Sequence, residues 1–289
     1  MQAASPALRV AATGRATACA AGRAAGRAGL PGSGHTAGHT TGHTAGHTTG
    51  HTTGHTPGHA SATLGAGGST DIIAPQPLVV KHLGVTPYLE TFAAMRAFTA
   101  ARDANTADEI WLTEHLPVYT QGLAGKREHL LDTGTIALVQ TDRGGQVTYH
   151  GPGQVIAYVL LDLTRRNLKV RELVRLIEDA VIATLNQCGV DGQRRSGMPG
   201  VYVDNAKIAA LGLKLKQGRS YHGVSLNVDP DLQPFAGIHP CGYPGLRVTS
   251  LAALGAALSS AQVSELLALQ LAVCIGALPA PPLAPVRLP

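Results

Sequence analysis

The chain has 289 residues, 44% of them hydrophobic and 14% charged, which is enough for a sizeable core in one or two domains. Residues 1–70 hold four arginines and no lysine, aspartate or glutamate, so much of the formal net charge of +5 belongs to this tail and argues weakly for a nucleic-acid partner. No apolar run reaches the roughly 18 residues of a transmembrane helix, and no signal-peptide core is present. We expect a cytoplasmic protein with neither a nucleic-acid nor a membrane partner.

Residues 1–75 are predicted to be a disordered extension, rich in Ala, Gly and Arg. A four-residue GHT-A/T repeat over 34–59 supplies seven of the 13 histidines and almost no apolar side chain, so its ordering entropy is not offset. The repeat can bind Ni²⁺, Cu²⁺ or Zn²⁺ loosely, and we favour incidental affinity over a metal-dependent enzyme because the repeat lacks carboxylates. The Arg-bearing start also mimics an organelle transit peptide, for which nothing else argues.

The folded domain is predicted over residues 76–280, followed by a Pro-rich tail at 281–289. Apolar periodicity predicts a helix around 89–99, a long helix over 170–189 and a final helix over 262–275. Short apolar segments at 109–115 and 135–143 are typical of strands, and the continuous apolar run 154–163 is typical of a central strand covered on both faces. Three more short strands are expected at 201–203, 207–215 and 220–228. This order predicts a single α/β domain around a mixed sheet.

The densest group of unusual residues precedes the predicted central strand, in RGGQVTYHGPGQ over 143–154. Its glycines allow a backbone to approach a ligand closely, and Gly-Pro-Gly forces a turn. A purely structural connection would not need Arg143, Tyr149 and His150 among so many glycines. The segment matches neither GxxxxGK[ST] nor GxGxxG, so it is not a phosphate-binding loop.

Two other segments put polar groups inside predicted strands. Lys207 opens a strand after a turn at Asp204-Asn205. Such a lysine is usually solvated, but beside a substrate pocket it can donate a proton or stabilise an anion. His222 precedes Gly223 in an alternating strand, and taken alone it is best interpreted as a core histidine with satisfied hydrogen bonds.

Cys241 lies between Pro240 and Gly242 and is expected on a turn, whereas Cys188 and Cys274 fall in predicted helices and are expected to pack in the core. A thiol is the best side-chain nucleophile near neutral pH, especially where a neighbouring cation favours the thiolate. A Cys–Lys or Cys–His acyl-transfer site is therefore a hypothesis. The four cysteines form no CxxC pair, so neither a disulfide framework nor a zinc site is expected.

Taken together and in this order, these segments resemble the lipoyl(octanoyl) transferase family, the octanoyl-[acyl-carrier-protein]:protein N-octanoyltransferases of lipoate biosynthesis. The resemblance runs from about Val79 to Ser250, and residues 1–70 have no counterpart in it. The matching segments are EHLPVYTQGLAGKREHLL, RGGQVTYHGPGQ, RxLxVRELV, PGVYV with KIAALGLK, YHGVSLNV and HPCGYPGL.

The resemblance implies a fold like the catalytic domain of biotin and lipoate ligases, α/β (α+β) with a mixed sheet flanked by helices. It implies an acyltransferase in which Cys241 accepts the acyl group and Lys207 is its paired lysine. Ala210 stands where some members carry a hydroxyl residue, which removes one side-chain hydrogen bond. The implied substrate-binding residues are Arg143, Gly144, Gly145, Gln146, Val147, Thr148, Tyr149, His150, Ala210, Leu211, Gly212, Gly223, Val224 and Ser225, with His222 in support.

The implied reaction transfers octanoate from octanoyl-acyl carrier protein to a lysine of lipoyl domains, through a thioester on Cys241, as the first step of endogenous protein lipoylation. The implied acceptors are the lipoyl domains of 2-oxoacid dehydrogenase E2 subunits and the glycine cleavage H protein. The thioester is already activated, so no ATP, cofactor or metal is expected. Either of two basic groups is a candidate dock for an acidic carrier protein, with a solvated surface as the equal alternative. They are Arg165, Arg166, Lys169, Arg171 and Arg175, and Lys214, Lys216 and Arg219.

Three rival functions fit parts of the pattern. A lipoate or biotin ligase would activate a free acid with ATP and has no equivalent need for Cys241. A protein that only binds lipoyl domains or acyl carriers would tolerate the loss of both Lys207 and Cys241. A cysteine hydrolase would release free octanoate, because water can replace the amine.

Overall fold

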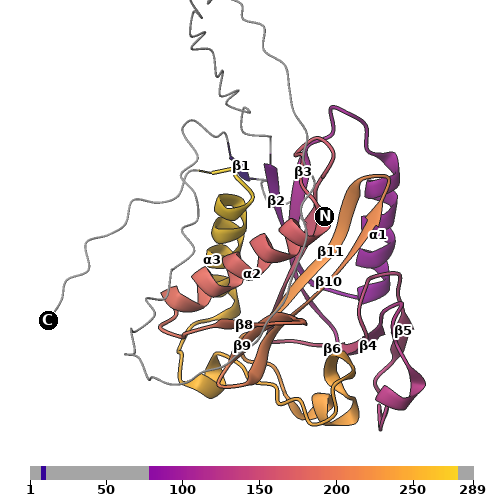
Figure 1. Cartoon of the computed structure of the whole chain (residues 1–289), viewed down its shortest axis with the longest axis vertical. Coiled ribbons are helices and arrows are strands. Elements are labelled where there is room, and N and C mark those ends of the chain that lie inside the picture. Colours follow the sequence, from indigo (N-terminus) through magenta and orange to yellow (C-terminus); the bar gives the residue numbers. More distant parts are fainter. Residues whose placement is uncertain (1–7, 11–77, 279–289) are drawn as a thin grey trace, which may run out of the picture. The chain divides into compact units, whose positions relative to one another are not determined.

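The computed structural model describes residues 8–10 and 78–278 of the chain (Figure 1). The described residues contain three α-helices, which are α1 (Tyr88–Ala101), α2 (Val170–Gln187) and α3 (Ser260–Cys274). The larger sheet has the order β1 (Leu8–Val10), β2 (Leu78–Thr86), β3 (Asp108–His115), β7 (Gln154–Leu160), β11 (Arg219–Asn227), β10 (Ala206–Lys216), β9 (Met198–Val203) and β8 (Gln193–Arg195). The smaller sheet has the order β5 (Leu138–Gln140), β4 (Val118–Gln121) and β6 (Val147–His150).

The sheets are mixed, as the sequence predicts. The β2–β3 and β4–β5 pairs are parallel, and the remaining neighbouring strands run antiparallel. The α/β fold class is therefore confirmed. No helix in the part of the chain that the structure describes is both long and apolar enough to cross a membrane.

Strand β7 is buried along its whole length because helices cover both faces of the sheet around it (Figure 1). Val155 and Val159 belong to the core that α2 and α3 complete on one face. Ile156 and Tyr158 point the other way, into a cluster that α1 closes with Met95. Alternate residues of a strand face opposite sides, so a continuous apolar run is what such a central strand requires.

Most predicted elements are confirmed, with three kinds of difference. The strand expected at 135–143 is only β5, because Asp142 and Arg143 leave it to form side-chain hydrogen bonds with His222 and Thr120. Strand β10 extends one residue beyond the expected strand at each end, whereas β11 has the expected length and begins one residue earlier. Strands β1, β2, β4, β6 and β8 were not expected, and the three residues of β8 are exposed and polar.

The domain boundaries remain predictions. Within the predicted extension, Leu8–Val10 form β1, which pairs antiparallel with β2, whereas residues 1–7 and 11–75 lie outside the described residues. The GHT repeat and the predicted tail at 281–289 also lie outside them.

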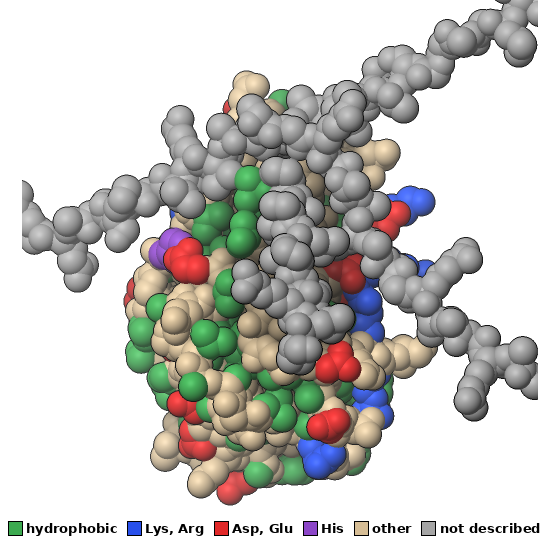
Figure 2. All heavy atoms as spheres, turned by 90° about the vertical axis from the view of Figure 1, so that its left-hand side faces the viewer, with side chains coloured by type: hydrophobic (Ala, Val, Ile, Leu, Met, Phe, Trp, Pro, Cys, Tyr) green, Lys and Arg blue, Asp and Glu red, His purple; other side chains and the backbone are tan. Residues whose placement is uncertain are grey.

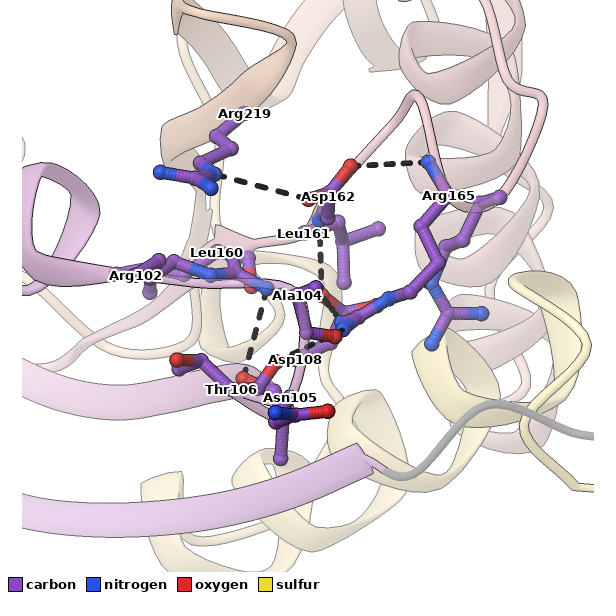
Figure 3. A network of polar contacts seen from close by, with 12 residues as sticks. Arg102, Ala104, Asn105, Thr106, Asp108, Leu160, Leu161, Asp162, Arg165 and Arg219 are labelled. Atoms are coloured by element: carbon purple, nitrogen blue, oxygen red, sulfur yellow. Dashed lines mark hydrogen bonds and ion pairs between the residues drawn. The ribbon is translucent and has the colours of Figure 1, made fainter.

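A buried carboxylate, Asp108, binds arginines from the end of α1 and from the loop after β7 (Figure 3). One of these arginines, Arg166, also donates to Ile275 O at the end of α3. The Asp108 carboxylate accepts hydrogen bonds from Arg102, from Arg165 Nη2 at 2.8 Å and from Arg166 Nε at 2.5 Å. Nearby, Asp162 pairs with Arg219 at 3.6 Å, which ties the tip of the β10–β11 hairpin to the same loop.

These ion pairs bear on the predicted docking surface. Arg165, Arg166 and Arg219 are held by aspartates, so their charge is partly neutralised. On the face shown in Figure 2, Lys and Arg side chains alternate with Asp and Glu side chains along one edge. A basic dock would therefore depend on the remaining members of the two groups, Lys169, Arg171, Arg175, Lys214 and Lys216.

Candidate active site

Local backbone geometry fixes the position of Lys207. Asp204 and Asn205, with φ of 46° and 66°, form the two-residue turn of the β9–β10 hairpin, and residues of these types tolerate left-handed backbone well. A bulge between Lys207 and Ala209 interrupts the pairing with β9. The backbone of Lys207 pairs on its other side, where its N–H donates to Arg247 O at 2.8 Å.

The Lys207 side chain is buried and points at the cysteine. Only 3% of the residue is exposed, and its Nζ lies 2.8 Å from Cys241 Sγ and donates to Pro199 O at 3.1 Å. Burial alone would lower the pKa of the ammonium, but the charge of Cys241 and its hydrogen bond outweigh burial, and the pKa is raised. The lysine is therefore held as a cation against the sulfur, and it forms no ion pair with a carboxylate of the described residues.

Gly200 makes room for this lysine. Its φ of 128° is unfavourable for residues with a side chain, and a Cβ there would lie 2.7 Å from Ala209 O and 3.1 Å from Lys207 Cε. Its N–H donates to Glu178 Oε1 of α2 at 2.9 Å. The glycine thus allows Pro199 O to meet the ammonium while α2 anchors the strand.

Cys241 lies on a short 3₁₀ turn, Pro240–Gly242, with a strained backbone. Its φ of 56° and ψ of 18° are left-handed, a conformation that costs a residue with a side chain about 1–3 kcal/mol. The N–H of His239 donates to His129 O at 2.9 Å and anchors the approach to the turn. Strain held by such anchors is typical of residues that present a reactive group.

A cavity of about 260 Å³ opens beside the pair. Cys241, Lys207, Pro199 and Tyr243 line one part of it. The cavity then crosses the face of the larger sheet over β10, β11 and β7, and α1 covers its remote part. Its remaining lining residues are Tyr88, Arg143, Gly145, Gln146, Val147, Thr148, His150, Ile156, Tyr158, Ala210, Leu211, Gly212, His222, Gly223, Val224 and Ser225.

The two histidines of the cavity are neutral. Burial, with the neighbouring His115 and Arg143 adding to it, lowers the pKa of His150 to about 3. Gln154 uses its amide N–H groups on Asn227 and on the Tyr149 carbonyl, so its Oε1 accepts from His150 Nδ1 at 3.2 Å. This leaves His150 Nε2 as the acceptor nitrogen of the ring.

His222 is held by Asp142. Burial lowers the pKa of His222 to about 4 although the Asp142 carboxylate opposes this, and Nε2 lies 3.0 Å from Asp142 Oδ1. The neutral ring therefore donates from Nε2, and the Tyr221 hydroxyl donates to the other oxygen of Asp142. The φ of His222 is 61°, a second left-handed residue at this cavity.

The structure brings together Cys241, Lys207 and most of the predicted pocket. Gly144 and Tyr149 lie outside the cavity lining, and Tyr149 packs against Tyr119 and Phe235 instead. His222 is buried, as interpreted from the sequence, but only its Nε2 has a hydrogen-bond partner among the described residues, and the residue also lines the cavity. Five lining residues were not predicted as site residues: Tyr88, Ile156, Tyr158, Pro199 and Tyr243.

Comparison with known proteins identifies the family. A family model described as the lipoyl protein ligase A/B catalytic domain matches residues 87–272. The chain belongs to this family. The octanoyltransferase of Aromatoleum aromaticum is 60% identical over 197 residues, which cover 66% of this chain and 85% of that protein. This similarity puts the chain among the octanoyltransferases, so it is an acyltransferase.

Solved structures support the fold. Lipoate-protein ligase A bound with ATP superposes with a TM-score of 0.58 at 16% identity, covering 68% of this chain and 84% of that one. A bipartite lipoate protein ligase from Thermoplasma acidophilum, described with its E2 lipoyl domain, gives a TM-score of 0.56 at 16% identity over 68% and 82% of the two chains. The predicted likeness to lipoate ligase catalytic domains is confirmed.

Proposed function

We propose that this chain moves an octanoyl group from octanoyl-acyl carrier protein to a lysine of a lipoyl domain, through a thioester on Cys241. The observation that carries the proposal is the 2.8 Å approach of the buried Lys207 ammonium to Cys241 Sγ at one part of an acyl-sized cavity. A cation at this distance favours the thiolate, which is the nucleophilic form of the sulfur.

The first half-reaction exchanges one thioester for another. The Cys241 thiolate attacks the acyl carbonyl, the bond from carbon to the carrier sulfur breaks, and Lys207 Nζ gives its proton to that leaving sulfur. Exchange between two thioesters is nearly isoenergetic, so it needs no nucleotide. The octanoyl group is then on Cys241 and Lys207 is a neutral amine.

The second half-reaction restores the enzyme. The amine of the acceptor lysine attacks the Cys241 thioester, and the carbon–sulfur bond breaks to release the Cys241 thiolate. The proton that the attacking amine loses returns to Lys207 Nζ, which re-forms the ammonium. Replacing a thioester by an amide drives the sequence forward.

The acceptors proposed are the lipoyl domains of 2-oxoacid dehydrogenase E2 subunits and the glycine cleavage H protein. Family membership supports a lipoyl-domain acceptor, because the family is that of lipoyl protein ligases. The similar ligase from Thermoplasma acidophilum is described together with an E2 lipoyl domain.

The test is the intact mass of the protein after mixing with octanoyl-acyl carrier protein, without acceptor, for the wild type and Cys241→Ser. We expect one octanoyl adduct on the wild type, none on the variant, and loss of the adduct when a lipoyl domain is added. Transfer without any adduct would mean direct attack by the acceptor lysine.

Two other outcomes separate the rival functions. An adduct that water discharges to free octanoate, with no amide formed, would indicate a hydrolase. No adduct and no transfer, followed by transfer of free octanoate when ATP is added, would indicate a ligase.

A further inference from the structure

The amine of Lys207 adjoins the atom that carries the acyl group. Its Nζ is 2.8 Å from Cys241 Sγ, which leaves no space for another atom between them. The carbonyl carbon of an octanoyl group on Cys241 is bonded directly to Sγ, and both residues line the cavity that receives the chain. The acyl carbon is therefore one bond away from an atom that the lysine already contacts.

The separation of Nζ and Sγ matches the geometry of a tetrahedral adduct that contains both atoms. If Nζ attacked the thioester carbon, the nitrogen and the sulfur would be bonded to the same carbon. With a C–N bond of about 1.46 Å, a somewhat longer C–S bond and an angle of about 111°, the two atoms would lie about 2.7 Å apart. The structure holds them at 2.8 Å, so the adduct requires little movement of either side chain.

The protein holds Lys207 beside the thioester. Only 3% of the residue is exposed, and Nζ donates to Pro199 O at 3.1 Å, a hydrogen bond that acylation of the cysteine does not remove. The backbone of Lys207 is tied as well, because its N–H donates to Arg247 O at 2.8 Å and its carbonyl accepts from Thr249 N at 3.0 Å. Nζ therefore stays next to the acyl carbon while the intermediate lasts.

Acylation of Cys241 also makes Lys207 nucleophilic. The lysine proton leaves with the carrier sulfur in the first half-reaction, and the cysteine charge that raises the pKa of the ammonium is lost when the sulfur is acylated. Burial, the largest influence on this pKa, then lowers it. The neighbouring Tyr202 stays neutral, because burial raises the pKa of its hydroxyl. A neutral amine is thus placed against an activated carbonyl, as a nucleophile in an acyl transfer must be.

We propose that Lys207 is a site of self-acylation: when no acceptor is bound, its amine takes the octanoyl group from Cys241 and the enzyme loses activity. The proposal rests on the acyl-enzyme of the proposed function. Nζ attacks the carbonyl carbon, a C–N bond forms, the C–S bond breaks, and the proton that the nitrogen loses goes to the Cys241 sulfur. The products are an octanoyl amide on Lys207 and a free thiol, so no other reactant is required.

The product of this transfer is stable and inactive. The acyl carbon moves between two atoms that lie 2.8 Å apart, so the octanoyl chain can remain in the same cavity. Acylation removes the charge of the lysine, so Lys207 can neither favour the Cys241 thiolate nor give a proton to the carrier sulfur. The acceptor therefore protects the enzyme, because discharge of the thioester competes with self-acylation.

Hydroxylamine at neutral pH separates the two adducts, because it cleaves thioesters and leaves amides intact. The wild type is incubated with octanoyl-acyl carrier protein without acceptor, and samples taken over time are assayed for transfer and, after hydroxylamine treatment, for intact mass. We expect a hydroxylamine-resistant octanoyl adduct that peptide mapping assigns to Lys207, with a loss of activity equal to the acylated fraction. An excess of lipoyl domain should suppress both.

Three variants test the route of the transfer. Lys207→Arg removes the nucleophile and should remain free of resistant adduct. Cys241→Ala removes the thioester and should also remain free of it. Lys126→Arg, at an exposed lysine that pairs with Glu128, should accumulate as much resistant adduct as the wild type.

The pH dependence of the rate distinguishes a buried neutral amine from a solvated lysine. A solvated lysine with a pKa of about 10.4 gains about thirtyfold in neutral amine between pH 7 and pH 8.5. Because Lys207 is already neutral in the acyl-enzyme, its rate constant, measured from the fully acylated protein, should change by less than about threefold. The rate constant should also be independent of protein concentration, because the transfer is intramolecular.

Three results would overturn the proposal. A wild-type thioester that is lost only by hydrolysis, without resistant adduct, would show that Lys207 does not attack it. Equal resistant adduct in Cys241→Ala would show direct acylation by the carrier, and a thirtyfold rise in rate with pH would show a solvated lysine. Failure of the proposed function looks different, because the wild type would then form no hydroxylamine-sensitive adduct at all.

Discussion

Two regions of this protein bury charge, and they do so in opposite ways. Around Asp108, a fully buried carboxylate meets three guanidinium groups, and its Oδ1 also accepts the backbone N–H of Asp162 (Figure 3). Around Lys207, one buried ammonium faces a carbonyl, an aromatic ring at 5.2 Å and a sulfur whose charge depends on its proton.

The difference separates stabilisation from reactivity. The Asp108 cluster satisfies its charge with several permanent partners from distant parts of the chain, so it locks the fold and leaves no group free to react. The Lys207 site provides one exchangeable partner, beside a strained residue and a cavity. Buried charge is costly in both regions, but only the second leaves a proton that can move.

The largest expected effect comes from removing the charge of Lys207, which tests whether this residue serves reactivity rather than stability. Lys207→Met should lower kcat/KM for octanoyl transfer by about 10³-fold, the scale of a positioned proton donor. The melting temperature should stay the same or rise, because an apolar side chain replaces a buried charge. Lys207→Arg, which keeps the charge in a bulkier group, is the matched variant. A Lys207→Met protein with a lower melting temperature and unchanged kcat/KM would contradict the role assigned to Lys207.

Removing the carboxylate should have the opposite outcome. Asp108→Asn leaves the buried Arg102 without its charged partner, so we expect the unfolding free energy to fall by about 3–5 kcal/mol. Urea denaturation measures this, and kcat of the folded fraction should be unaffected. The control is Asp191→Asn, an exposed carboxylate that accepts a hydrogen bond from Gln193, with an expected change within about 0.5 kcal/mol. Equal stability of the two variants would contradict a structural role for Asp108.

The smallest expected effect is the contribution of each cavity histidine to the pH dependence of the unfolding free energy. In the folded state the pKa values of His150 and His222 are about 3 and about 4, below their ordinary value of about 6.5 in the unfolded chain. As the pH falls from 7 to 5, only the unfolded chain takes up these protons, so each histidine should reduce the unfolding free energy by about 2 kcal/mol.

This pH dependence is measured by urea denaturation at pH 7 and pH 5. His150→Asn should flatten it by about 2 kcal/mol. Equal stability of the wild type at both pH values would mean that the two histidines are not neutral inside the fold.

Much of the fold could be predicted because it follows from local patterns. The three- and four-residue spacing of Leu173, Ile177 and Ala180 predicts an amphipathic helix, and these residues are buried in α2. The uninterrupted apolar run of β7 requires cover on both faces. Strand β8 gave no such signal, because its three residues are polar and exposed.

The site was only partly predictable because its geometry is non-local. Cys241 and Lys207 are separated by 34 positions, and family resemblance, not spacing, paired them in advance. A lysine at the start of a strand gives no local sign of burial, yet Lys207 is 3% exposed because residues 247–249 pack against it. Tyr88 lines the cavity from α1 and Tyr158 lines it from β7, and neither segment lies near Cys241 in the sequence.

The left-handed backbone of Cys241 has an evolutionary consequence. Glycine is the residue that this conformation favours, so a chain that lost its thiol by a change to glycine would gain stability as it lost its nucleophile. Selection for folding alone would therefore drive position 241 away from cysteine. A cysteine at such a position is consistent with selection for the proposed chemistry at a cost in backbone strain.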